Sequence, residues 1–224
     1  MSGLGQIGEL PGFAGAGHQV AQRDIDQYDL VSINNPSIDT AWFGAGTSTG
    51  TTVAALVQAN ALADWPRNAA YCFTGGTSGG TITANFIDQF GSPVTEVVSV
   101  GSAAGGGTTF GTAIVAKFLS GTVNPNTSTT GTYTVGFGTV SNGSAASNWF
   151  GLLSKLGGTS DVKILRWTNN GTATTLAKGT AMGTLVDANR HAFQGTSGVK
   201  VTDTYTVILK PSFDNTNFGT MCAL

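Results

Sequence analysis

Few side chains in this sequence are of the types that exchange protons or attack a substrate. The chain has two histidines, His18 and His191, and two segments, residues 46–50 and 76–80, match the G-x-S-x-G pattern of a nucleophilic serine. That pattern indicates catalysis when it joins a strand to a helix and when a histidine and an acid complete it. Neither segment precedes a clear helical pattern, so we interpret both as flexible turns and predict no catalytic residues.

The motifs expected of a cofactor or metal site are also missing from the sequence. Residues 101–109 are rich in glycine but lack the Gly-Lys-Ser/Thr ending with which a phosphate-binding loop holds phosphate and magnesium. No two histidines lie three or four residues apart, as in a helical zinc pair. Asp24, Asp26 and Asp29 offer fewer oxygen ligands than a calcium loop, so we interpret them as a solvated acidic turn. We therefore predict neither a metal site nor a cofactor.

The cysteines and tryptophans have a structural interpretation. Cys72 and Cys222 are the only thiols. Cys72 lies in an apolar stretch where a small buried side chain is expected, and a disulfide between the two stays open. The four tryptophans are Trp42, Trp65, Trp149 and Trp167. They could form a platform for a sugar ring, but such side chains more often anchor a core or a subunit interface, which we favour.

Composition limits the possible partners. Of the 224 residues 33 are glycine and 10% are charged, with 10 Lys and Arg against 12 Asp and Glu. This balance lacks the basic footprint of a nucleic-acid-binding surface, so we predict no direct contact with nucleic acid. No apolar run approaches the roughly 18 residues that cross a bilayer, so we predict no membrane partner. The start of the chain does not resemble a secretory signal, and we expect synthesis in a cytoplasm without export.

The first 50 residues are predicted to form an extended N-terminal arm. Leu4, Ile7, Leu10 and Phe13 are spaced three apart, but glycine and Pro11 oppose a helix there. An apolar arm that cannot bury itself should lie on the body or on a neighbouring subunit, with simple disorder as the alternative. The candidate residues for an interface with a partner or a neighbouring subunit are Leu4, Ile7, Leu10, Phe13, Trp42 and Phe43.

Residues 51–224 are predicted to form an all-β body, a β-sandwich or jelly-roll. The alternative is two small β-subdomains divided near residues 140–160. Short β-prone runs alternate with Gly, Ser, Thr and Asn, which is typical of sandwiches and barrels. The predicted strands are residues 67–73, 80–88, 94–100, 109–119, 131–137, 162–167, 172–177 and 201–209. The period of two in the last run places Tyr205 and Val207 on a packing face, opposite Thr204 and Thr206. Residues 53–63 and 147–156 are ambiguous between helix and strand.

Four short motifs in the body resemble a pattern that recurs in the decoration or cement proteins of tailed bacteriophage capsids. They are Pro66-Arg67-Asn68, Asp88-Gln89-Phe90-Gly91, Thr95-Glu96 and Val135-Gly136-Phe137-Gly138. Residues 183–186 and 199–209 resemble the closing strands, so the resemblance covers about residues 64–210. It implies a non-enzymatic, all-β virion protein on the capsid surface. Its partners would be the major capsid protein and, as a homotrimer, other copies of itself.

The core of this resemblance is a predicted β-hairpin over residues 80–100. Its turn spans residues 88–93, where Gly91 is free to adopt a positive φ. Glu96 follows on an otherwise apolar strand, and we expect it to pair with Arg67 or to accept hydrogen bonds from backbone amides.

Three alternatives remain at the level of sequence. The chain could be another virion part, such as a tail-tube, head-fibre or shell protein. From a different class, it could be a carbohydrate-binding β-module with a tryptophan platform. A hydrolase that uses one of the two G-x-S-x-G serines ranks third.

Overall fold

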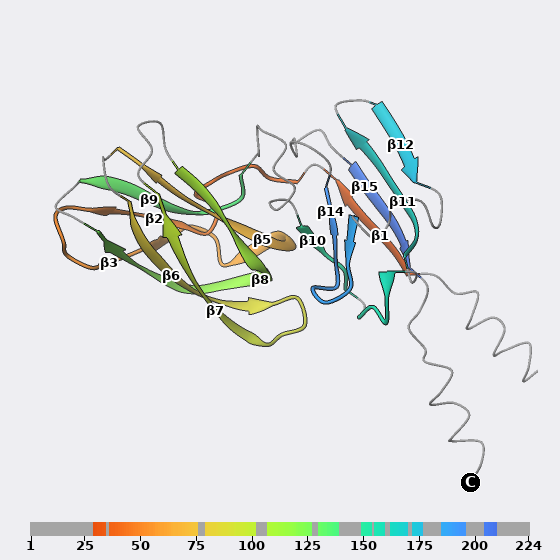
Figure 1. The fold of residues 1–224 in the computed structure, drawn as a ribbon, viewed down its shortest axis with the longest axis horizontal. Helices are drawn as coiled ribbons and strands as arrows, with labels where there is room; N and C mark the ends of the chain where they lie inside the picture. The colour runs from red at the N-terminus through yellow and green to blue at the C-terminus, as the bar shows by residue number, and fades with distance from the viewer. Residues whose placement is uncertain are drawn as a thin grey trace, which may run out of the picture.

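Every element labelled in Figure 1 is a β-strand, and every strand pair in the described residues is antiparallel. The computed structural model describes residues 29–34, 36–75, 79–101, 107–126, 130–138, 149–153, 155–159, 162–169, 172–176, 185–195 and 204–209. The predicted all-β class is confirmed. In this part of the chain no helix has the length and apolar character needed to cross a membrane.

A long strand, β8, organises the larger sheet. β8 (Gly107–Pro125) pairs along its first half with β5 (Leu62–Thr74) and along its second half with β6 (Gly80–Asp88). β7 (Pro93–Val100) is the hairpin partner of β6 and ends this path of paired strands. The register of β8 shifts against both neighbours, and such bulges increase the bend and twist of a strand. The bent β8 therefore carries the pairing from one layer of a sandwich to the other.

Four shorter strands close one side of this sandwich. They are β2 (Gly44–Ser48), β3 (Ala54–Ala55), β4 (Val57–Gln58) and β9 (Gly131–Gly136). β9 lies between β5 and β2, β2 pairs with β4, and β3 pairs with β8. Because β3, β4 and β5 follow one another in the chain, these pairings lead back to β8.

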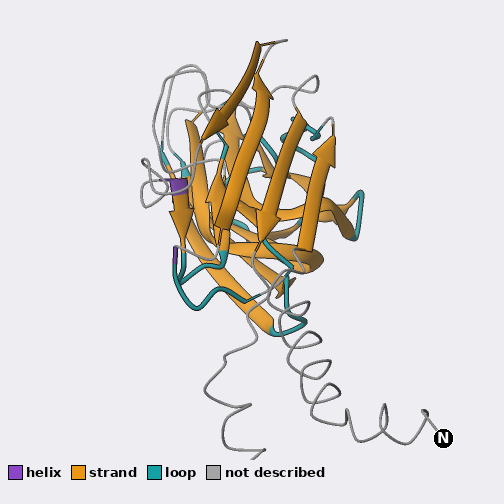
Figure 2. Cartoon of the chain, turned by 90° about the vertical axis from the view of Figure 1, so that its right-hand side faces the viewer, coloured by secondary structure: helices purple, strands orange, loops and turns teal. Residues whose placement is uncertain are grey.

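The other region combines a branch of the large sheet with a separate sheet. In the branch, β10 (Trp149–Gly151) joins β5 to β14 (Ala192–Gln194), which pairs with β13 (Val186–Asp187). The separate sheet consists, in order, of β1 (Asp29–Asn34), β15 (Thr204–Leu209), β11 (Val162–Asn169) and β12 (Thr172–Leu176). Figure 2 looks at the molecule from the side of this sheet.

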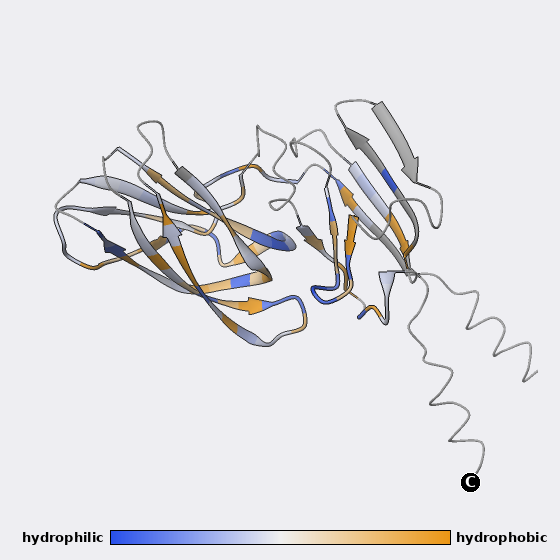
Figure 3. Cartoon of the chain, viewed as in Figure 1, coloured by the Kyte–Doolittle hydropathy of each residue, from blue (hydrophilic) through white to orange (hydrophobic). Residues whose placement is uncertain are grey.

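Two hydrophobic clusters hold these strands together. The first lies among the strands from β2 to β9 and contains Phe43 and Phe86, whose ring centroids are 5.5 Å apart. The second lies between the branch and the separate sheet and contains Phe150 and Tyr205, with centroids 5.0 Å apart. Apolar residues alternate with polar ones along many of these strands (Figure 3). The first cluster takes its buried residues from between Phe43 and Phe137, and the second takes them from between Phe150 and Val207 and from Ile33 on β1.

Most predicted strands are present with similar bounds. The hairpin strands β6 and β7 match almost residue for residue, and β8 and β5 extend beyond their predicted ends. In β15, Tyr205 and Val207 are buried while Thr204 and Thr206 are partly exposed, which confirms the predicted faces. The helical interpretation of residues 53–63 is wrong, because this run pairs edge to edge with β2 and β8 as β3 and β4.

The predicted arm boundary at residue 50 lies too far along the chain. Residues 29–34 pair with β15 as strand β1, and residues 44–48 pair on both edges as strand β2. The Gly-rich composition of residues 44–48 suggested irregular chain, but hydrogen bonding to β9 and β4 makes them a strand. Residues 1–28 of the predicted arm lie outside the described residues.

The predicted turn between β6 and β7 is confirmed. Gly91 has a φ of 87°, in the region that favours glycine. Oδ1 of Asp88 accepts hydrogen bonds from the amides of Phe90 and Ser92, each at 2.8 Å. This side-chain-to-backbone bonding is the physical reason for an aspartate at the start of the turn.

Candidate functional site

The short motifs singled out in the sequence meet in a junction between the two hydrophobic clusters. At its centre is Arg67, which is 4% exposed. Its guanidinium carbon lies 3.7 Å from the ring centroid of Phe137, in the first cluster, and 5.5 Å from that of Phe150, in the second. The guanidinium donates to the carbonyl of Ser37 and forms an ion pair of 3.2 Å with Asp64. Arg67 therefore links both clusters through its flat faces and the N-terminal segment through its edge.

Asn68, the next motif residue, bonds two segments that are far apart in sequence. Its side-chain amide donates to the carbonyl of Gly111 on β8 at 3.1 Å. Its side-chain carbonyl accepts from the amide of Trp149 on β10 at 2.9 Å. Asn68 is 3% exposed, so both of its polar ends are satisfied inside the protein. It fixes the start of β10 against the strands that surround the first cluster, which we call the first region.

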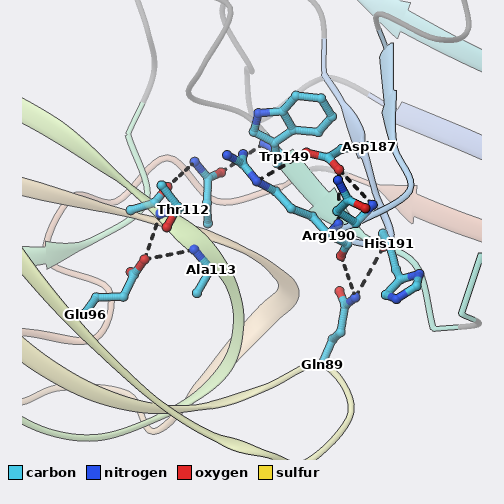
Figure 4. A network of polar contacts seen from close by, with 11 residues as sticks. Gln89, Glu96, Thr112, Ala113, Trp149, Asp187, Arg190 and His191 are labelled. Carbon is cyan, nitrogen blue, oxygen red and sulfur yellow. Dashed lines mark hydrogen bonds and ion pairs between the residues drawn. The ribbon is translucent and has the colours of Figure 1, made fainter.

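Glu96 confirms one of the two predicted alternatives. Its Oε1 accepts hydrogen bonds from the amides of Thr112 and Ala113 at 2.7 and 2.8 Å (Figure 4). Its Oε2 accepts a hydrogen bond from the hydroxyl of Tyr71 at 2.8 Å. The expected pairing with Arg67 is absent, because Arg67 pairs with Asp64 instead. Glu96 lies on β7 and the two amides lie on β8, beyond the end of the β6 pairing. The carboxylate thus takes the place of a neighbouring strand for this part of β8.

Gln89 connects the β6–β7 turn to the turn between β13 and β14. Its side-chain amide donates to the carbonyls of Arg190 and His191 at 3.0 and 3.3 Å (Figure 4). Arg190 in turn pairs with Asp187 at 3.4 Å and lies 5.4 Å from the ring centroid of Trp149. The second motif therefore also serves the junction.

Burial changes the acid–base properties of several groups in this region. Burial lowers the pKa of Arg67 to about 10, against the opposing effect of Asp64, so the guanidinium stays charged at neutral pH. Burial, and then the charge of Glu96, raise the pKa of Tyr71. Burial also raises the pKa of Tyr133.

The residues predicted for an interface have different surroundings. Leu4, Ile7, Leu10 and Phe13 lie outside the described residues. Phe43 is fully buried in the first cluster, so its side chain is not available to a partner; the sequence placed it in an arm, whereas it directly precedes β2. Trp42 is half-buried, packs against Phe137 and donates its indole N–H to the carbonyl of Leu62 at 2.8 Å.

The other chemically distinctive residues that the structure describes have internal partners. Ser48 is 1% exposed at the end of β2, and its hydroxyl donates to the carbonyl of Thr52 at 3.3 Å. Cys72 is buried beside the hydroxyl of Thr108, as expected of a small core residue. Trp65 donates its indole N–H to the carbonyl of Gly151 at 2.8 Å, which agrees with the anchoring interpretation. The described residues contain no group of three or more His, Cys, Asp or Glu able to hold a metal ion.

An uncharged surface, which we call the outer face, extends over part of β7, β6 and β8. Residues on the opposite side of these strands, such as Ile82 and Phe86, are buried in the first cluster. Paired in register across the three strands, the outer face consists of Ser99, Thr81 and Asn124; Val97, Thr83 and Thr122; and Thr95, Asn85 and Ser120. Eight of these nine carry a hydroxyl or an amide, and the exception, Val97, is 66% exposed.

Side-chain hydrogen bonds order one row of the outer face. Thr95 donates to the side-chain carbonyl of Asn85 at 2.7 Å, and Asn85 donates to the hydroxyl of Ser120 at 3.0 Å. The sequence analysis did not single out this surface. The alternation of polar and apolar residues in β6 was a signal for one polar face, but its extension over β7 and β8 depends on strand pairing.

Comparisons with known proteins found no match: no family model fits the chain, and neither the curated proteins nor the solved structures contain a significant relative.

Proposed function

We propose that this chain is a non-enzymatic structural protein of a tailed bacteriophage virion. In this proposal it is a decoration or cement protein that binds the outer capsid lattice, formed by the major capsid protein, as a homotrimer. It stabilises the shell by mass action, since a ligand that binds only the assembled state shifts the equilibrium away from disassembly.

The observation that carries the proposal is the convergence of the motifs on which the resemblance rests. Arg67 packs on Phe137. Asn68 donates to the carbonyl of Gly111, which precedes the Thr112 amide bound by Glu96. Gln89 donates to the turn between β13 and β14. These motifs are separated by up to about 70 residues in the sequence, yet they form one junction. A fold shared with that family would account for their meeting in one junction.

The outer face supports a role in binding another protein surface. Because none of its nine residues is charged, covering it would not require the desolvation of a charge, which is a large cost at interfaces. Its hydroxyl and amide groups can exchange hydrogen bonds with water for bonds with a partner. We place the capsid contact on this face, centred on Val97.

Two matched substitutions test this placement. Val97→Lys puts a charge on the outer face, and Val57→Lys puts the same charge on β4, where the valine is 76% exposed. Both variants should fold, and only Val97→Lys should lose co-sedimentation with capsids assembled without this protein. Equal binding by the two variants would remove the outer face from the proposal, and no binding by the unmodified protein would remove the capsid.

A glycan array and a Trp149 variant separate the carbohydrate-binding alternative from the capsid proposal. A glycan array should give no saturable binding if the tryptophans are anchors. Saturable binding that disappears on replacement of Trp149, which is partly exposed, would favour the glycan-binding module instead.

A further inference from the structure

The turn between β13 and β14 holds a histidine in a conformation that few side chains adopt. His191 has a φ of 49° and is the one described non-glycine residue with a positive φ. Such backbone conformations persist where surrounding contacts enforce them. In Figure 3 this turn is hydrophilic, between apolar segments of its strands.

Both the backbone and the ring of His191 are fixed by hydrogen bonds. Its carbonyl accepts from the amide of Leu152 at 2.8 Å and from Gln89 at 3.3 Å. Its ring Nδ1 accepts from the amide of Leu156 at 2.8 Å. Leu152 and Leu156 are both buried in the second cluster, and Gln89 belongs to the first region. One residue thus ties residues 155–159, the β13–β14 turn and the β6–β7 turn together.

The bond to the Leu156 amide defines the protonation state of the imidazole. An Nδ1 that accepts a hydrogen bond carries no proton, so the ring is neutral with its proton on Nε2. Protonation of Nδ1 would point a ring N–H at the Leu156 N–H. The attraction between the two groups would then become a repulsion. The hydrogen bond and the charged imidazolium are therefore incompatible.

The surroundings of the ring do not favour its charged form. Lys155 precedes the bonded segment, and its Nζ lies 5.3 Å from the ring centroid of Phe90, which itself contacts the imidazole edge to face at 5.3 Å. Asp187 opposes this effect but is paired with Arg190. Burial and then Lys155 lower the pKa of His191, in agreement with the geometry.

We propose that His191 is an acid-sensitive latch that fastens residues 155–159 onto the second cluster and onto the junction. At neutral pH the imidazole holds the Leu156 amide. On acidification the protonated ring releases it, so that residues 155–159 open while the first region remains folded. This inference is independent of capsid binding.

Hydrogen exchange of single amides, measured by NMR, tests the latch. Below about pH 6.5 the protection factor of the Leu156 amide should fall, by up to about tenfold per pH unit. The amide of Leu56, which bonds to the carbonyl of Gly121 in the first region at 2.9 Å, should keep its protection over the same range. Constant protection of Leu156 down to pH 5 would overturn the proposal.

A conservative variant removes the titration while keeping the geometry. Asparagine tolerates positive φ and offers a side-chain carbonyl that accepts an N–H without titrating near neutral pH. His191→Asn should therefore abolish the pH dependence at Leu156, whereas His18→Asn, at the other histidine, should leave it intact. The same pH dependence in His191→Asn and in the unmodified protein would contradict the latch.

The tautomer gives a second readout that needs no variant. The ¹⁵N chemical shifts of the His191 ring at neutral pH should show a proton on Nε2 and none on Nδ1. A proton on Nδ1 would contradict the latch directly.

Discussion

Gly111 and Glu96 provide the sharpest test of how the junction is built. A Cβ added at Gly111 would lie 2.1 Å from Oε2 of Glu96 and 2.7 Å from its Cδ. The φ of Gly111 is not positive, so alanine meets no backbone strain there. We therefore expect Gly111→Ala to displace the carboxylate, and not to distort the strand.

The magnitude follows from the bonds that the displaced carboxylate leaves behind. Two backbone amides and the hydroxyl of Tyr71 lose their acceptor, and a buried donor without a partner costs about 1–3 kcal/mol. Glu96→Ala should lower the free energy of unfolding by about 3–5 kcal/mol, and Gly111→Ala by about 2–4 kcal/mol. Glu96→Gln keeps an acceptor for the amides and should cost only about 1–2 kcal/mol.

A double-mutant cycle isolates the contact between the two residues. In the Glu96→Ala background the space beside Gly111 is free, so Gly111→Ala should cost less than about 1 kcal/mol. Urea unfolding followed by tryptophan fluorescence gives each free energy. If the effects of the two single substitutions add to within about 0.5 kcal/mol, the two residues are not coupled. The need for glycine at position 111 would then have a cause other than Glu96, and the reasoning would be refuted.

Three further predictions concern stability. Arg67→Lys should lower the free energy of unfolding by about 2–3 kcal/mol, because an ammonium cannot stack flat on Phe137 and also bind Ser37 and Asp64 with in-plane N–H groups. An unchanged urea midpoint would contradict this. Gly91→Val should cost about 1–2 kcal/mol, because its φ of 87° strains a β-branched residue, and an unchanged melting curve would count against it. Above about pH 10 stability should fall by up to about 1.4 kcal/mol per pH unit for each of Tyr71 and Tyr133. Their pKa values are raised in the fold, so the unfolded state ionises first; Tyr71→Phe should reduce the slope measured by urea unfolding.

The strands were predictable wherever local sequence determines them. Residues 80–100 alternate polar and apolar side chains and contain Gly91 in a turn opened by Asp88, so pattern and turn chemistry agree. The two predicted roles of Glu96 could be formulated because a charge on an apolar strand needs a partner. The choice between them depended on which groups β8 leaves unpaired, and that follows only from the pairing of β5 and β6.

Features that arise from long-range pairing were not predictable. Residues 44–48 contain two glycines and resemble a loop, yet pairing with β9 and β4 makes them a strand and brings Phe43 into the core. The sequence also gave no reason to connect His191 with Leu156, because a ring nitrogen that binds an amide 35 residues away leaves no local pattern. The outer face likewise exists only once β7, β6 and β8 are paired.

We have proposed that this chain binds a capsid lattice as a trimer. The most direct measurement is the native mass of the purified protein, followed by its co-sedimentation with capsids assembled without it. A mass of three times 22.7 kDa and saturable binding to those capsids are the predicted results. A monomer or a larger ring that stays in the supernatant would contradict the claim and would favour the tail-tube or glycan-binding alternatives.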